Sequence, residues 1–409
     1  MKRRKQSRRW RGKKYAPVMI GMLVLLMNLA DLKNSNLISG SIICQAAERQ
    51  SENTETENNS GGTEKEKITQ TEASTVSDIL EELDLSRVQR MLDQMLGEES
   101  FSMKDMLDGL IKGEKVLSED TVQEMVHSFL FSGLEKEKSL LIKILLLILL
   151  SAVLANFADV FESGQIGDIC FYIVYLLLFI LLMASFSSVT RSVQQTITWM
   201  AEFMRGLAPA YFLTISIAAG SSTAAVFYEG VLILTWLIQE VILNLLFPGA
   251  CLYVLISLIN NLSKEEMLGK MAELLDTAVS WGLKTLLGMV VGLQVVRGLI
   301  APVMDTLKRS ALGKAAGALP GVLVRNCLGV VILFAFVAAG AGPVIHYGIL
   351  SLLYRFLAAI AQPVSEKRIV DSLATMGEGC ALLLRILFTA EILCILDFVI
   401  LMTGIGGSG

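Results

Sequence analysis

The sequence has few of the residues that bind metals or carry out acid–base chemistry. Its only two histidines, His127 and His346, have no partner at a metal-ligand spacing such as HExxH. The six cysteines are scattered without any CxxC pair, and five of them lie in apolar segments, where a thiol behaves as a small hydrophobic group. They are Cys44, Cys170, Cys251, Cys327, Cys380 and Cys394. We expect no disulfide framework, no metal site and no cofactor.

Charged residues are also scarce. Only 18% of the 409 residues are charged, against about 25% in typical soluble domains. Hydrophobic residues make up 53% of the chain, and the mean hydropathy is positive. This composition predicts an all-α, polytopic transmembrane helix bundle. The net charge of −4 conceals nine Lys or Arg within the first 14 residues, which is typical of a targeting segment and not of a nucleic-acid surface.

The N-terminal region has the features of an export signal followed by a tether. Residues 16–30 (APVMIGMLVLLMNLA) form an apolar run of 15 residues, shorter than the ~20 that span a bilayer. Small residues at Cys44 and Ala46 allow cleavage after Ala46, so residues 1–46 are interpreted as a signal peptide or signal anchor. Residues 47–76 are polar and lack aromatic residues, which predicts a disordered tether.

Residues 77–138 are predicted to form short amphipathic helices outside the cytoplasm. Two capping boxes, Ser86-x-x-Gln89 and Thr121-x-x-Glu124, mark expected helix starts. One helical face collects the apolar residues Val88, Met91, Leu92, Met95 and Leu96. This face could dock on the chain's own bundle, on the membrane or on a partner protein.

A polytopic membrane domain is expected over residues 139–404, followed by a flexible tail at 405–409. Segment length predicts about eight spans, near 140–161, 166–190, 206–227, 229–260, 275–300, 317–340, 343–361 and 379–403. The segment 229–260 is too long for a simple crossing and contains Phe247-Pro248-Gly249, so it is either one kinked helix or two shorter ones. Basic residues near 305–314 and 366–368 favour the cytoplasm, whereas Arg191 and Arg205 then fall outside.

Five ionisable residues lie within apolar segments, where charge is costly and commonly functional. They are Glu240, Lys284, Arg385, Glu391 and Asp397. Such groups could couple ions or protons, but pairing of Lys284 and Arg385 with Glu240 and Glu391, or snorkelling to an interface, is the favoured interpretation. No acidic pair, serine dyad or phosphate loop accompanies them, so we expect no catalytic residues and no enzyme.

Small residues and prolines mark candidate helix interfaces or a conduit wall. The segment 206–225 combines Pro209 with Gly220, Ser221, Ser222 and Thr223, and small polar residues of this kind serve both close packing and polar cavities. Gly288 and Gly292 form a GxxxG motif, and Gly313, Gly317 and Gly321 recur every fourth residue. Close packing of helices is the favoured interpretation of both glycine motifs. GALPGVLV, with Pro320, echoes GLAPAYFL and could mark an inverted repeat of broken helices, although chance explains the echo as well.

The order of these parts resembles a known family. The chain runs from FLFSGLEKEKSLLIKILLLILLSAVLANFADVF through WMAEFMRGLAPAYFLTISIAAGSSTAA and MDTLKRSALGKAAGALPG to IAQPVSEKRIVDSL. From about residue 80 onward it is similar to the stage III sporulation protein AE family of endospore-forming Firmicutes. The resemblance implies a multi-pass protein of the mother-cell membrane around the engulfed forespore. It implies no catalytic residues.

The same resemblance implies partners. These are the other proteins of the stage III sporulation A operon and a forespore membrane protein, which together build a channel-like complex, with a homo-oligomer also possible. An independent small-molecule or ion permease is the main alternative, and an intramembrane enzyme is a third.

Overall fold

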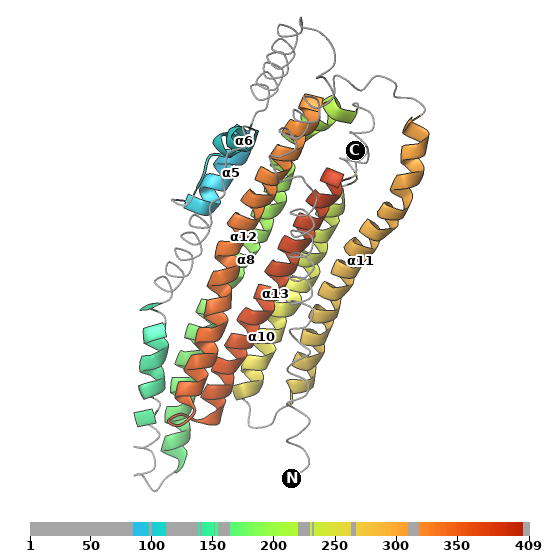
Figure 1. The fold of residues 1–409 in the computed structure, drawn as a ribbon. Helices are drawn as coiled ribbons and strands as arrows, with labels where there is room; N and C mark the ends of the chain where they lie inside the picture. Colours follow the sequence, from blue (N-terminus) through green and yellow to red (C-terminus); the bar gives the residue numbers. More distant parts are fainter. Residues whose placement is uncertain are drawn as a thin grey trace, which may run out of the picture. The chain divides into compact units, whose positions relative to one another are not determined.

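The computed structural model describes residues 85–97, 100–111, 138–139, 141–150, 152–153, 164–219, 230, 233–262, 267–309 and 319–403, all within one compact unit that begins at Ile79. These residues are helical with no strand, as the all-α prediction requires. The labelled helices are α5 (Ser86–Leu96), α6 (Met103–Ile111), α8 (Gly164–Ala219), α10 (Phe247–Leu262), α11 (Gly269–Arg309), α12 (Leu319–Ala361) and α13 (Lys367–Thr403) (Figure 1). The expected signal segment, tether and tail lie outside the described residues.

Within the described residues, five helices are long and apolar enough to cross a membrane. They are Tyr172–Leu207, Ile233–Leu262, Gly269–Gly292, Asn326–Ala361 and Lys367–Val399, and a shorter apolar helix covers Leu141–Leu150. The count of eight spans is therefore not confirmed. The membrane character follows from apolar helices that can satisfy all their backbone groups internally.

Two of the predicted breaks between spans are absent. The spans expected at 166–190 and 206–227 are joined in the continuous helix α8, which extends to Ala219. The spans expected at 317–340 and 343–361 form the single helix α12, which continues through Pro343. A proline removes one backbone donor, and neighbouring helices can make good that loss in a membrane bundle. For the segment 229–260, where one kinked helix and two shorter ones were both open, the described part is one continuous helix, Ile233–Leu262. A π-helical turn, Ile242–Leu246, directly precedes Phe247 and Pro248, where the proline cannot donate to the carbonyl of Asn244.

Helix α13 lies at the centre of the bundle and packs against α8, α10, α11 and α12. Its inward residues include Leu373, Met376, Leu383 and Leu387, all fully buried. Polar groups also join the helices, because in a membrane they have no better partner than one another. Such bonds contribute about 0.6 kcal/mol each on average.

Four of these polar contacts fix the relative positions of α8, α10, α12 and α13. Tyr175 donates to the Leu258 carbonyl at 2.9 Å and lies 2.9 Å from Ser372 Oγ. The Ser185 and Tyr354 hydroxyls are 2.6 Å apart. Asn261 donates to Thr375 at 3.0 Å.

The amphipathic helices α5 and α6 dock on the bundle, one of the alternatives left open by the sequence. Val88, Leu92 and Leu96 are buried, and α5 and α6 pack against α12 while α5 also contacts α8. The capping box predicted at Ser86 is wrong. Leu85 is the N-cap of α5, and no side chain makes a capping hydrogen bond there. Gln89 instead joins α5 to the start of α6 through hydrogen bonds to the Phe101 carbonyl and the Met103 amide.

The docking contacts are specific. Trp199 Nε1 donates to the Met91 carbonyl at 2.8 Å, and the rings of Phe101 and Phe334 lie 5.2 Å apart. Trp199 also belongs to an aromatic cluster with Phe203 and Phe336. This cluster is the surface on α8 and α12 that receives the amphipathic region.

Candidate conduit and helix-interface site

Two acidic side chains are buried in the C-terminal half of α13. Glu391 is 6% exposed and Asp397 is 0% exposed. Cys394, also buried, lies between them on the same helix at a spacing of three residues. Because i and i+3 positions share a face, the three side chains form a stripe along α13.

The two carboxylates have different surroundings. Asp397 Oδ2 accepts a hydrogen bond from Thr235 Oγ1 at 3.1 Å, whereas Oδ1 has no hydrogen-bond partner within the described part of the chain. The Glu391 carboxylate lies directly against Gly340 of α12, where a Cβ would collide with both of its oxygens. Gly340 therefore makes the space that the glutamate occupies. The sequence prediction missed this glycine, although Gly340 stands three residues before Pro343, at the same Gly-x-x-Pro spacing as in GLAP and GALP.

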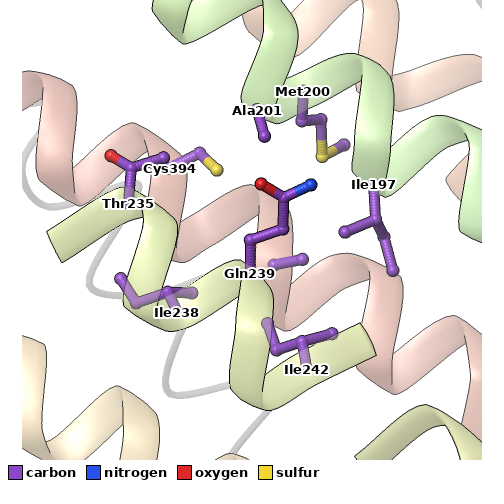
Figure 2. A pocket seen from close by; sticks show the side chains of 9 residues that line it. Ile197, Met200, Ala201, Thr235, Ile238, Gln239, Ile242 and Cys394 are labelled. Carbon is purple, nitrogen blue, oxygen red and sulfur yellow. The ribbon is translucent and has the colours of Figure 1, made fainter. Parts of the chain in front are cut away.

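A small cavity opens beside this stripe, where α8, the helix 233–246 and α13 meet (Figure 2). Its lining is mostly apolar, and the Gln239 amide extends into the space between Met200 and Cys394 (Figure 2). The lining residues are Ile197, Met200, Ala201, Thr235, Ile238, Gln239, Ile242, Ala390 and Cys394. The cavity volume is about 10 Å³, the size at which a cavity begins to hold one water molecule. It is too small for an organic substrate.

The predicted charge pairs do not form. Glu240 is exposed and accepts a hydrogen bond from Asn244 one turn away, and Lys284 is exposed on α11. Arg385 is half-buried and donates to Ser280 of α11 at 3.4 Å. In the described segments, no ion pair joins Glu240, Lys284, Arg385 or Glu391. The pairing interpretation was wrong because sequence position along a helix does not say which face each charge occupies.

The GxxxG motif is not a packing site within this chain. A Cβ added to Gly288 or Gly292 would meet nothing within 4 Å. Close approaches occur elsewhere: a Cβ at Gly282 would collide with Leu246, and one at Gly379 would collide with Val254. A Cβ at Gly377 would come within 3.1 Å of the Ser351 carbonyl oxygen. These glycines were missed because they stand outside any four-residue repeat.

The remaining candidates are only partly placed. Pro209 falls inside the continuous helix α8, whereas Pro320 and Gly321 fall in the first turn of α12. Their two positions are not equivalent, so the predicted pair of broken helices is not found. The candidates Gly220, Ser221, Ser222, Thr223 and Gly317 lie outside the described residues.

Comparison with known proteins gives one consistent result. The chain matches the stage III sporulation protein AE family over residues 101–323 and 318–405. It is 22% identical over 319 residues to the stage III sporulation protein AE of Bacillus subtilis (strain 168), covering 74% of this chain and 80% of that protein. No solved structure matches. The chain therefore belongs to the stage III sporulation protein AE family.

Proposed function

We propose that this chain is a membrane-embedded component of the channel or secretion-like complex that links the mother cell and the forespore, and that it is required for forespore development after engulfment. The observation that carries the proposal is the family match, which spans the described bundle from residue 101 to residue 405. The structure is compatible with an assembly component. Among the described residues, the cavity beside Gln239 is too small for an organic substrate, and five long apolar helices form one bundle around α13.

The proposed partners are the other proteins of the stage III sporulation A operon and a forespore membrane protein. The proposed location is the mother-cell membrane around the engulfed forespore. The docked helices α5 and α6 carry the charged, exposed residues Arg90, Asp93, Lys104 and Asp105. A charged, exposed surface of this kind is suited to water and to polar partners. It is not suited to lipid.

A deletion and complementation experiment tests the proposal. Removal of the gene from an endospore-forming host should allow engulfment and then stop late forespore gene expression, with shrinkage of the forespore. The full-length chain should restore both, and it should copurify with the operon-encoded proteins after crosslinking in engulfed sporangia. Normal spore yield from the deletion strain would overturn the proposal.

An independent ion or small-molecule permease is the second candidate. Glu391 and Asp397 are buried within an apolar helix. Ionisable groups at such positions mark ion and proton paths in many transporters. The two functions separate in purified form. A permease should move a solute or an ion across liposomes that contain this chain alone, whereas an obligate assembly component should not.

A further inference from the structure

The outer face of α8 changes chemical character along its length. Between residues 169 and 180 its exposed large side chains are all apolar: Ile169, Tyr172, Ile173, Leu176, Leu177 and Ile180. From residue 184 to residue 205 the exposed positions are small or polar: Ala184, Ser187, Ser188, Arg191, Ser192, Gln194, Gln195, Glu202 and Arg205. Most of these recur at intervals of three and four residues. We call this surface the α8 polar face.

The inner face of the same helix segment stays apolar. Val189, Val193, Ile197, Met200 and Phe203 are buried against the bundle. The change is therefore confined to the surface that meets the surroundings of the protein. The hydrocarbon core of a bilayer cannot hydrogen-bond to arginine, glutamine and glutamate side chains, so this part of α8 faces something other than hydrocarbon.

The helix 233–262, which lies beside α8, shows which kind of surface the bundle presents at the same depth on another side. Tyr175 contacts Leu258, whereas the cavity brings the segment 197–201 to the segment 235–242, so α8 and the helix 233–262 run antiparallel. Both rise about 1.5 Å per residue, so these two contacts place Leu245 level with the turn from Ser188 to Ser192 and Leu237 level with residues 195–200. Leu245 is 67% exposed, and Trp236 and Ile233 are 51% and 59% exposed. Glu240 and Asn244 are also exposed on this helix and hydrogen-bond to each other, so its outer side at this depth is mainly but not wholly apolar.

The position of helix α5 indicates which environment the α8 polar face meets. Helix α5 docks beside the polar face, where the Met91 sulfur would lie 3.3 Å from a Cβ at Gly206. Its residues Arg90 and Asp93 are exposed. Two surfaces built from separate parts of the chain are thus polar on this side of the bundle. The outer side of the helix 233–262 is apolar apart from Glu240 and Asn244.

We propose that the α8 polar face lines a water-filled space at a depth where the helix 233–262 meets lipid, so that α8 forms part of the wall of a hydrophilic passage. The inference deepens the proposed function, and it rests on that function for the two compartments that the passage would join. Hydrophilic solutes are the class of cargo that such a wall would admit. The buried cavity beside Gln239 is no part of this passage.

Cysteine reactivity in native membranes tests the proposal. Two depth-matched pairs are Ser188→Cys with Leu245→Cys, and Gln195→Cys with Leu237→Cys. Each variant is treated with a membrane-impermeant charged maleimide in membranes from sporulating cells, and labelling is corrected for the parent chain with its six cysteines. The thiolate is the reactive form and apolar surroundings suppress it, so each α8 position should react at least about tenfold faster than its partner.

Three outcomes decide the matter. Labelling confined to the α8 positions supports a water-filled space beside lipid. Labelling of neither member of a pair overturns the proposal, because a partner or lipid then covers α8. Equal labelling of both members also overturns it, because this end of the bundle then lies outside the membrane. Spore yield, measured for every variant, reports separately on the proposed function, and variants that sporulate normally are known to fold.

Discussion

At the level of single residues, the close approach of α13 to its neighbours depends on a glycine that no motif marks. A Cβ at Gly379 would collide with Val254 of α10 and lie 3.3 Å from Phe186 of α8. Both neighbours are held in place by helices, so Gly379→Ala should lower the free energy of unfolding by about 1–3 kcal/mol through overpacking. Reversible unfolding in mixed detergent micelles measures the change.

The matched control is Gly288→Ala, a glycine on α11 with nothing within 4 Å of its Cβ position. Alanine favours a helix over glycine by about 1 kcal/mol, so this variant should be neutral or slightly more stable. Equal destabilisation by the two substitutions would contradict the packing argument. The comparison also tests whether the GxxxG motif has any role within the isolated chain.

The hydrogen bond from Thr235 to Asp397 gives a second prediction at this scale. Thr235→Val keeps the shape of the side chain and removes the donor, leaving the buried carboxylate without the partner it has among the described residues. An unsatisfied buried polar group costs about 1–3 kcal/mol, and the same detergent unfolding assay should detect the loss. Thr235→Ser keeps the hydroxyl and should retain most of the stability. In an Asp397→Leu background, Thr235→Val should cost much less.

At the level of elements, Gln89 holds the amphipathic pair together. Its side-chain oxygen accepts from the Met103 amide at 2.9 Å, and its nitrogen donates to the Phe101 carbonyl at 2.8 Å. Gln89→Ala should release α6 from α5, which would appear as faster amide hydrogen exchange in Met103–Ile111. Gln94→Ala is the control, since Gln94 is exposed on the same helix. Unchanged exchange in α6 with Gln89→Ala would show that apolar packing alone holds the pair.

Sequence reasoning succeeds for this protein where one residue pattern decides the outcome. The apolar period of Val88, Met91 and Leu92 predicted a helix, and that helix forms. Reasoning from length failed at Pro343, because a proline inside a long apolar run permits either a break or a continuous helix, and the choice depends on packing against neighbouring helices. The faces of Gly288 and Glu240 could not be predicted for the same reason. Which side of a helix is inward is set by the rest of the bundle.

At the level of the whole molecule, the length of one helix limits how the bundle can sit in a membrane. The helix Asn326–Ala361 has 36 residues and is about 54 Å long at 1.5 Å per residue, whereas the hydrocarbon core is about 30 Å thick. Such a helix is too long for one perpendicular crossing and too short for two with a turn between them. Its ends must therefore extend beyond the hydrocarbon, or the helix must tilt.

The continuity of α12 changes the expected topology. The sequence placed both basic segments, 305–314 and 366–368, in the cytoplasm, with two spans between them. The structure has one helix there, from Leu319 to Ala361, with α11 ending at Arg309 before it and α13 beginning at Lys367 after it. A single crossing places the two segments on opposite sides of the membrane, so the positive-inside rule cannot hold for both.

A labelling experiment with sidedness tests this arrangement. Ser310→Cys, directly after α11, and Gln362→Cys, directly after α12, should react with an impermeant maleimide from opposite faces of sealed vesicles of known orientation. The α5 and α6 region docks on Trp199 and Phe334, which lie away from the α12–α13 connection. If the N-terminal signal exports that region as predicted, Gln362 should therefore be the cytoplasmic position. Reaction of both positions from one face would mean that α12 enters and leaves the membrane on the same side, and a single crossing by this helix would have to be abandoned.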